Sequence, residues 1–341
     1  MKINKLIKDF FNISLSATKA NSVYSNAEVQ AYLVATSLNN DSLESATGLS
    51  PDTIQRRIVL GTKACMPWFE HVQKTQLDLV QYILCRNRRV RWSLVVDESL
   101  EPFFGKVDNL KEQLEARDLP DFVSKYRVQR GSTGSFHYVN IALYSKLGTF
   151  PLAVIPKVVD EDVYPKIEKI LTEIKRIHRD IILLADRGYG NQKMISLCQK
   201  LKVSYCIRLK KKGKLKTIKK NHRQFFWYAF GNVTFRVVIH TSHSRETFFF
   251  AVGKKGGSSQ WFRLLYRDRW SIENLFKNCD RIQLRTSSRN TNFRLFCFVL
   301  SLFLMLLYQL KKLITGEKSK PIRRTLYDLF RIQVLVVLRV T

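Results

Sequence analysis

The sequence is poor in cysteine and histidine, with six of each among 341 residues. The cysteines form no C-x-x-C pair, and only His240 and His243 lie close together along the chain. This spacing argues against a zinc site or a disulfide framework. Cysteines in apolar stretches, such as Cys206 and Cys297, are typical of a reducing compartment, so we expect a cytoplasmic protein.

Acidic residues are also scarce. There are 28 Asp and Glu residues against 58 Lys and Arg residues, which gives a net charge of +30. Such an excess repels itself unless an anionic partner is present. The basic residues run from Lys2 to Arg339 rather than forming one tail, which predicts a long nucleic-acid-binding surface with salt-sensitive affinity. A membrane surface is the rival partner, but it would favour a single basic amphipathic segment.

The chain has one long uncharged apolar stretch, from Leu295 to Leu310. As a helix it would extend about 24 Å, which is short of the ~30 Å hydrocarbon core of a bilayer. Charged residues flank it at Arg294, Lys311 and Lys312. We therefore expect a buried core helix and no membrane partner. The N-terminus lacks the sustained apolar region of a secretory signal.

Residues 1–90 read as a helical region that binds DNA. Within it, residues 42–58 predict a short helix ending at Gly48, a turn, and a second helix with Ser50 as N-cap and Pro51 at its first position. This pattern is typical of a helix-turn-helix, although an ordinary helical hairpin has it too. The second helix carries three side chains of types that contact phosphates or base edges: Gln55, Arg56 and Arg57.

From Trp92 onward the pattern changes to strands alternating with helices. Strands are predicted over 92–99, 136–145, 149–157, 181–185 and 204–209, and helices over 160–178 and 191–201. Three strands, a helix, a strand, a helix and a strand is the order of the RNase H-like fold. We therefore predict an α/β fold with a mixed sheet flanked by helices.

The remaining segments complete the predicted domain organisation. The core comprises residues 91–209 and 258–315, and a β-rich insertion at 210–257 precedes the helix that carries Glu273. Residues 316–341 form a C-terminal tail. No internal repeat or long low-complexity linker is evident in the sequence.

Two aspartates, Asp97 and Asp186, end or closely follow apolar runs that read as buried strands. A carboxylate beside apolar strands needs a compensating partner, and a metal ion is the usual one. Farther along, Tyr266, Arg269 and Glu273 lie at i, i+3 and i+7, so one face of a helix would present all three. The pattern indicates a metal-dependent phosphodiester site.

Three carboxylates from separated elements suit two divalent cations, which prefer oxygen ligands. Held ~3.5–4 Å apart, two such ions can activate a water or 3'-hydroxyl and stabilise the leaving oxygen. We predict Asp97, Asp186 and Glu273 as the metal-binding catalytic residues. Glu98 competes with Asp97, but adjacent strand residues face opposite ways, so only one can reach a shared site. Asp97 is preferred because its side chain is short and rigid.

These motifs together resemble prokaryotic insertion-sequence transposases of the DDE class. The matching features are Asp97 at a strand end, D-R-G-Y from Asp186 to Tyr189, and Y-(2)-R-(3)-E from Tyr266 to Glu273. The class has D-x-G-[YF] and Y-(2)-R-(3)-E-(6)-K. The resemblance extends over about 92–310. It implies an RNase H-like core, two Mg²⁺ or Mn²⁺ ions, recognition of terminal inverted repeats, strand cleavage and strand transfer.

The resemblance also implies roles for single residues. Tyr266 and Arg269 would approach transposon-end DNA while Glu273 binds metal. Arg187, inside D-R-G-Y, is another DNA-binding candidate, although Arg187 and Gly188 could simply form the turn after a strand.

The sequence departs from the family pattern where the family lysine would fall. Position 280 is Asp280, with Lys277 one turn before it and Arg281 directly after it. Either cation is a candidate replacement for DNA binding.

The function implied is therefore cut-and-paste DNA transposition by an enzyme of the cytoplasm that associates with the nucleoid. Its partner would be double-stranded DNA, both transposon ends and target. Pairing two ends requires at least a homodimer. The alternative is a transposase-derived DNA-binding protein without catalytic activity, which Asp280 and the unusual tail motivate.

Overall fold

The computed structural model describes residues 3–15, 24–45, 49–61, 65–104, 123–124, 130–157, 161–213, 215, 225–242, 246–253, 256–316 and 321–338. Its strands are β1 (Ser93–Phe103), β2 (Val123–Ser124), β3 (Gly134–Ser145), β4 (Gly148–Pro156), β5 (Ile182–Ala185), β6 (Ser204–Arg208), β7 (Phe225–Phe230), β8 (Val233–Thr241) and β9 (Thr247–Val252). Its helices are α1 (Ile3–Ser14), α2 (Asn26–Asn39), α3 (Pro51–Gly61), α4 (Cys65–Arg86), α6 (Tyr164–Ile177), α7 (Gln192–Lys200), α9 (Ser259–Arg267), α10 (Trp270–Asp280), α11 (Thr291–Thr315) and α12 (Ile322–Leu338).

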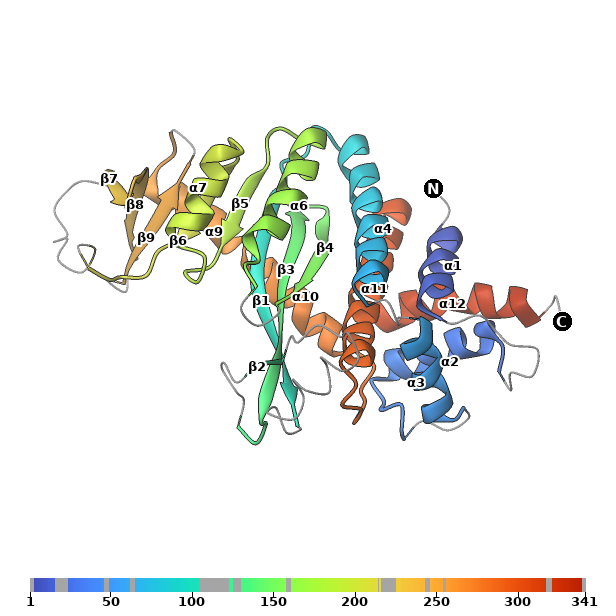
Figure 1. Ribbon diagram of the computed structural model, residues 1–341. Helices are drawn as coiled ribbons and strands as arrows, with labels where there is room; N and C mark the ends of the chain where they lie inside the picture. The colour runs from blue at the N-terminus through green and yellow to red at the C-terminus, as the bar shows by residue number, and fades with distance from the viewer. Residues whose placement is uncertain are drawn as a thin grey trace.

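The expected α/β fold with a mixed sheet is confirmed (Figure 1). The central strands are ordered β4-β3-β1-β5-β6. Pairing is antiparallel among β4, β3 and β1, and parallel among β1, β5 and β6. This is the arrangement expected from the predicted order of strands and helices. The strands predicted within 210–257 are β7, β8 and β9, and β9 pairs with β6, so they extend the core sheet.

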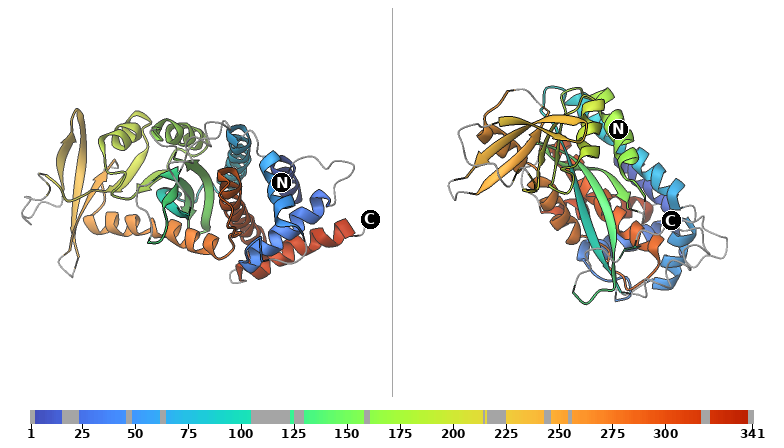
Figure 2. Two further views of the ribbon diagram at one scale, coloured as in Figure 1. Left: turned by 60° about the horizontal axis from the view of Figure 1, so that its bottom comes forward. Right: turned by 60° about the vertical axis from the view of Figure 1, so that its left-hand side comes forward.

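Alternating side chains of the sheet enter two separate apolar cores. Val95, Leu184 and Cys206 pack with residues of α9, α10 and α11 on one face. Leu94 and Leu183, each adjacent in sequence to one of these, pack with α4, α6 and α7 on the other. Figure 2 shows the helices on the two sides of the sheet. Every strand position is thereby assigned to one face, including the charged residues at the strand ends.

Helix α11 is the apolar stretch predicted to be a core helix. It begins where the Asn290 side chain accepts a 2.9 Å hydrogen bond from the Phe293 N–H, and it ends at Gly316, whose φ is 68°. The helix is long and apolar enough to cross a membrane, but 89% of its most apolar window is buried inside the protein. It packs against β4, α3, α10 and α12, which is the position expected of a core helix.

The N-terminal region is helical as predicted. The prediction of a short helix ending at Gly48 is wrong for the residues of that segment that the structure describes. Leu43 to Ser45 form a turn, and residues 46–48 lie outside the described residues. The Ser42 hydroxyl accepts hydrogen bonds from the N–H groups of Glu44 and Ser45, both at 3.2 Å. These local bonds compete with the helical ones. Helix α3 does begin at Pro51, with Ser50 accepting from the Thr53 N–H at 3.5 Å.

The turn at 41–45 docks onto the segment that follows α10. The Leu43 N–H donates to the Arg285 carbonyl at 2.9 Å. The Glu44 carboxylate accepts from the Thr286 hydroxyl at 2.7 Å and from the Ser287 N–H at 2.9 Å. Burial alone would raise the pKa of Glu44, but the hydrogen bonds from Thr286, Ser42 and Ser287 together outweigh it and lower the pKa to about 2. The ionised carboxylate therefore stabilises this contact.

The Glu44 contact leads to a prediction about stability and pH. Because the pKa of Glu44 is lowered in the folded state, its contribution is fully present above about pH 4.5 and is lost as the pH falls toward 2. Glu44→Gln should lower the free energy of unfolding by about 1 kcal/mol at pH 7, a value reduced for solvent screening. Urea denaturation from pH 7 to pH 2.5 measures the difference, which should shrink on acidification. The exposed Glu70→Gln serves as control, and a pH-independent difference would contradict the assignment.

Candidate active site

Asp97 and Asp186 lie side by side on two neighbouring parallel strands. The prediction that Asp97 ends its strand is wrong, because β1 continues to Phe103, whereas Asp186 directly follows β5 as expected. Val96 of β1 is in register with Ala185 of β5, so the next residue of each strand sits at the same level. Asp97 follows Val95 by two positions, and Asp186 follows Leu184 by two positions. Since Val95 and Leu184 face α9 and α10, and side chains alternate along a strand, both aspartates lie on that same face. The sequence prediction that these carboxylates share one site is therefore supported by the register of the sheet.

The helix expected to carry Tyr266, Arg269 and Glu273 is broken. Helix α9 ends at Arg267 and α10 begins at Trp270. The Arg269 N–H donates to the Tyr266 carbonyl at 3.0 Å, and the Ile272 N–H donates to the Arg269 carbonyl at 3.1 Å. These are i to i−3 bonds, which tighten the helix locally. The break directs Tyr266 and Arg269, 3% and 8% exposed, toward the sheet.

Tyr266 and Arg269 connect all three predicted carboxylates. The Tyr266 hydroxyl donates to Oδ1 of Asp186 at 3.0 Å. One guanidinium nitrogen of Arg269 contacts Oδ2 of Asp97 at 2.6 Å, and the other contacts Oε1 of Glu273 at 2.5 Å. Residues separated by as many as 172 positions in the chain are thus joined in one polar cluster.

The charges in this cluster influence one another. Burial raises the pKa of Asp97 to about 6, the negative charges of Asp186 and Glu273 add to the rise, and Arg269 with the Glu98 N–H opposes it. Burial and the charge of Asp186 also raise the pKa of the Tyr266 hydroxyl, which keeps it protonated as a hydrogen-bond donor. A carboxylate with a raised pKa gains from any cation placed beside it.

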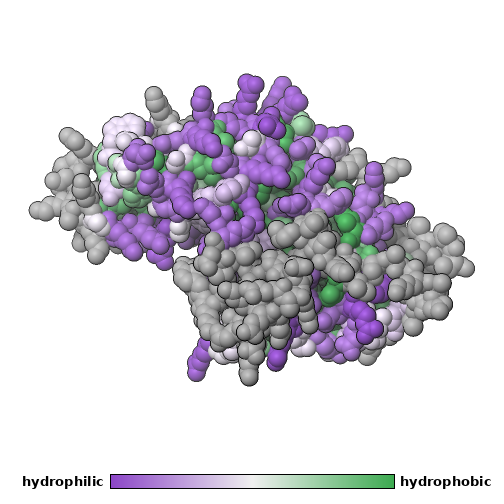
Figure 3. Space-filling view, viewed as in Figure 1, coloured by the Kyte–Doolittle hydropathy of each residue, from purple (hydrophilic) through white to green (hydrophobic). Residues whose placement is uncertain are grey.

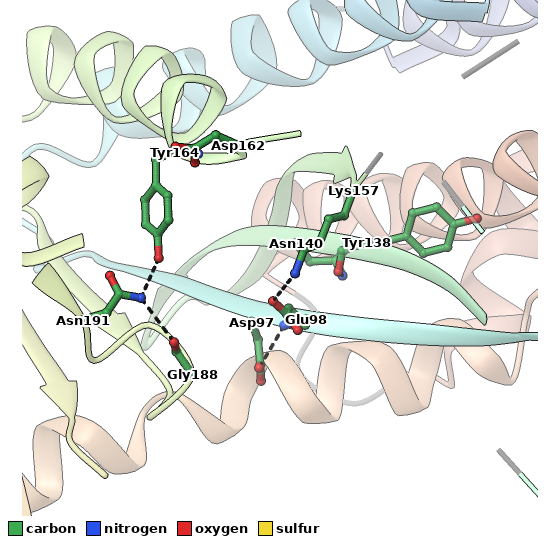
Figure 4. A network of polar contacts seen from close by, with 9 residues as sticks. All are labelled: Asp97, Glu98, Tyr138, Asn140, Lys157, Asp162, Tyr164, Gly188 and Asn191. Atoms are coloured by element: carbon green, nitrogen blue, oxygen red, sulfur yellow. Dashed lines mark hydrogen bonds and ion pairs between the residues drawn. The ribbon is translucent and has the colours of Figure 1, made fainter. Parts of the chain in front are cut away.

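Asp97 and Glu98 point to opposite sides of β1, and Asp97 is the one that faces α10 (Figure 4). The Glu98 carboxylate lies 3.7 Å from the ammonium group of Lys157, on the side of β4 and α6. The Glu98 backbone N–H nevertheless donates to Oδ1 of Asp97 at 2.9 Å. The preference for Asp97 over Glu98 therefore agrees with the geometry, and Glu98 supports Asp97 through its backbone.

The donor set suits a hard divalent cation. Within the described parts of the chain, no three His, Cys, Asp or Glu side chains already form one metal-binding group. Asp97, Asp186 and Glu273 still offer only carboxylate oxygens, which Mg²⁺ and Mn²⁺ prefer. The Arg269 guanidinium lies between two of these carboxylates and supplies positive charge there. The residues fit the expected metal chemistry, with Arg269 as the competing cation.

Asn140 is a buried polar residue next to Asp97 that the sequence analysis missed. It is directly opposite Asp97 in the β1–β3 register and is 3% exposed. Its amide donates to the Ser99 hydroxyl at 2.8 Å. The signal that could have found it is a lone amide inside the apolar stretch at 136–145.

The predicted DNA-binding residues near the carboxylates differ in exposure. Tyr266 and Arg269 are buried and bonded to the carboxylates, whereas the others lie on the surface. Arg187, directly after Asp186, is exposed, as are Lys277 and Arg281 at the end of α10. Asp280, at the position of the family lysine, is also exposed. Partial loss of hydration raises the pKa of its carboxyl group, and the positive charge of Arg285 opposes the rise.

The three candidates on α3 differ in exposure. Arg56 is exposed and Gln55 is partly exposed. Arg57 is only 7% exposed, and its guanidinium donates to the Tyr24 carbonyl at 2.6 Å and to the Asn26 side chain. We therefore reassign Arg57 from DNA contact to packing between helices, because its donors are already used inside the protein.

The Arg269 ion pairs lead to a test by unfolding. Arg269→Gln leaves the partly buried carboxylate of Asp97 and the half-exposed one of Glu273 without their counter-charge. The free energy of unfolding should therefore fall by about 2 kcal/mol in metal-free buffer, less than for a fully buried pair. Adding Asp97→Asn should recover part of this loss, with a coupling energy of at least about 1 kcal/mol. Guanidinium chloride denaturation measures both.

Arg267→Gln, at an exposed neighbouring position, is the matched control and should change stability by no more than about 0.5 kcal/mol. Strictly additive effects of the two substitutions would contradict the proposed ion pair.

Comparisons with known proteins identify the fold and the family of the chain. None of the curated proteins matches the chain. A cryo-EM structure of the piggyBac transposase synaptic complex with hairpin DNA matches with a TM-score of 0.62 and 13% identity, over 96% of this chain and 75% of that chain. At this identity the likeness demonstrates a shared fold.

The sequence also matches the Transposase DDE domain family over residues 124–308. This range includes Asp186 and Glu273 and covers more than half of the chain, while Asp97 precedes it. The chain belongs to the family of DDE transposases.

Proposed function

We propose that this chain is a metal-dependent transposase that binds the terminal inverted repeats of an insertion sequence, cleaves DNA there and joins the freed 3'-hydroxyl to target DNA. The observation that carries the proposal is the convergence of Asp97, Asp186 and Glu273, linked by Tyr266 and Arg269. Membership of the family supports a DNA-cleaving and strand-transferring enzyme. The metal requirement and the end recognition are the parts that we infer.

The protein's own residues position and balance charge at this site. Two divalent cations, when bound, would activate the attacking oxygen and stabilise the leaving oxygen. Asp97 would hold them from within β1, Asp186 from the end of β5, and Glu273 from α10. The Tyr266 hydroxyl fixes the orientation of Asp186, and the Glu98 N–H fixes that of Asp97. Catalysis of this kind depends mainly on positioning and charge stabilisation.

Double-stranded DNA is the partner we propose. The net charge of +30 supports a polyanionic partner, and hydrophilic side chains cover most of the coloured surface in Figure 3. The matched piggyBac structure is described as a synaptic complex with hairpin DNA, which also supports a DNA partner. We further propose that two copies act together, because two ends must be joined, and that the protein works in the cytoplasm on the nucleoid.

A second candidate function is DNA binding without catalysis. It is favoured by Asp280, which places a carboxylate where the family has a cation. Arg285 acts on Asp280 but does not remove its charge. Under this candidate, the protein would bind transposon ends and protect or mark them without cutting.

Carboxylate substitutions test the proposal. Asp97→Ala, Asp186→Ala and Glu273→Ala should each lower Mg²⁺-dependent nicking at least ~10³-fold, because each removes a charged group that would hold the cation. The assay uses duplexes carrying the DNA that flanks the gene. Equilibrium binding of the same duplexes should remain within a few-fold of wild type.

Glu98→Ala is the matched control, because its carboxylate lies on the opposite side of β1. It should retain most of the activity. Loss of cleavage in Glu98→Ala with activity retained in Asp97→Ala would reverse the assignment of the first ligand. Binding without any metal-dependent nicking by the wild-type protein would favour the second candidate.

A further inference from the structure

We propose that Arg208 and Arg263 form a phosphodiester-binding site around the ring of Phe248. Arg208 lies on β6, the strand next to the one that Asp186 follows. This inference rests on the proposed function. It assigns a position beside the carboxylate cluster where the DNA backbone would be bound. The site would hold a phosphate of the strand that is cut.

Arg208 continues the row of charged residues that Asp97 and Asp186 form across the parallel strands β1, β5 and β6. Ala185 of β5 is in register with Ile207 of β6, so the following residues, Asp186 and Arg208, sit at the same level. Arg208 also follows Cys206 by two positions and therefore lies on the face of α9 and α10. Asp97 inside β1, Asp186 directly after β5 and Arg208 at the end of β6 thus lie in one row, with a cation beside two carboxylates.

Arg263 reaches the same place from α9. Its guanidinium carbon lies 4.6 Å from the centre of the Phe248 ring, and that of Arg208 lies 5.0 Å from the same centre. Arg263 precedes Tyr266 by three residues, so the two side chains lie on neighbouring parts of one helix surface. Two guanidinium groups from different elements therefore converge on one aromatic ring.

Aromatic packing fixes the position of that ring relative to the carboxylates. Phe248 stacks with Phe250 at 6.3 Å, and Phe250 contacts the Tyr266 ring at 5.2 Å. Tyr266 in turn donates to Asp186. The two arginines are therefore held at a defined distance from the carboxylate cluster, rather than on a free surface loop.

The positive charge of Arg208 and Arg263 is only partly balanced by the described residues. Among the described residues Arg263 makes no ion pair, and Arg208 has only Glu246, at 3.5 Å and 59% exposed. Two like charges on one ring repel each other unless an anion joins them. A phosphodiester fits, because guanidinium groups bind its oxygens with paired hydrogen bonds. In a protein of net charge +30, beside the proposed catalytic carboxylates, DNA is the anion that meets these requirements.

Salt-dependent binding tests this site. A random-sequence 30-base-pair duplex is titrated by fluorescence anisotropy in EDTA between about 50 and 300 mM salt. Arg208→Gln and Arg263→Gln should each reduce the slope of log affinity against log salt by about 1. The double variant should reduce it by about 2 and weaken binding at 0.1 M salt on the order of 10- to 100-fold. Arg208→Lys/Arg263→Lys should keep most of the slope.

Arg179→Gln is the matched control. It removes the same charge from an exposed position just before β5, at the end of that strand away from Asp186. It should bind like wild type. A double glutamine variant with wild-type slope and affinity, or an equal loss in Arg179→Gln, would overturn the site. Nicking is assayed separately, so failure of the proposed enzymatic function would appear there without altering this binding comparison.

Discussion

The site depends on the parallel pairing of β1 with β5, which brings the carboxylates of Asp97 and Asp186 to the same level of the sheet. Asp97 and Asp186 cannot move apart without breaking the register of the sheet. Burial, with a smaller contribution from the negative charges of Asp186 and Glu273, raises the pKa of Asp97 to about 6. A cation at this place therefore stabilises the ionised carboxylates. Arg269 supplies one from the turn between α9 and α10, and the same stabilisation makes the place suited to divalent metal ions.

The rest of the fold holds the third carboxylate near the first two. Helix α11 lies buried beneath α10 and β4 and so anchors the helix that carries Glu273. The N-terminal region also contacts the segment after α10. Glu44 accepts a hydrogen bond from this segment, and the Leu43 N–H donates to the Arg285 carbonyl. The contacts of α11 and of the turn at 41–45 thus flank α10 from two sides.

Much of this arrangement was predictable from sequence. Strands such as 181–185 are short apolar runs that end in a charge, and the position of Asp186 followed from that pattern. The break at Asp268 and Arg269 was not predictable, because neither residue disfavours a helix and the break is accompanied by long-range contacts to Asp97 and Asp186. The buried position of Arg57 was likewise hidden, since its partners lie about thirty residues away.

The most direct test of the account is the anomalous scattering of crystals soaked in MnCl₂. The account predicts manganese peaks in contact with the carboxylates of Asp97 and Asp186, with Glu273 close by and the Arg269 guanidinium displaced from between Asp97 and Glu273. Manganese bound elsewhere, with Arg269 still paired to both carboxylates under saturating metal, would contradict the claim that these residues form the metal site of a transposase.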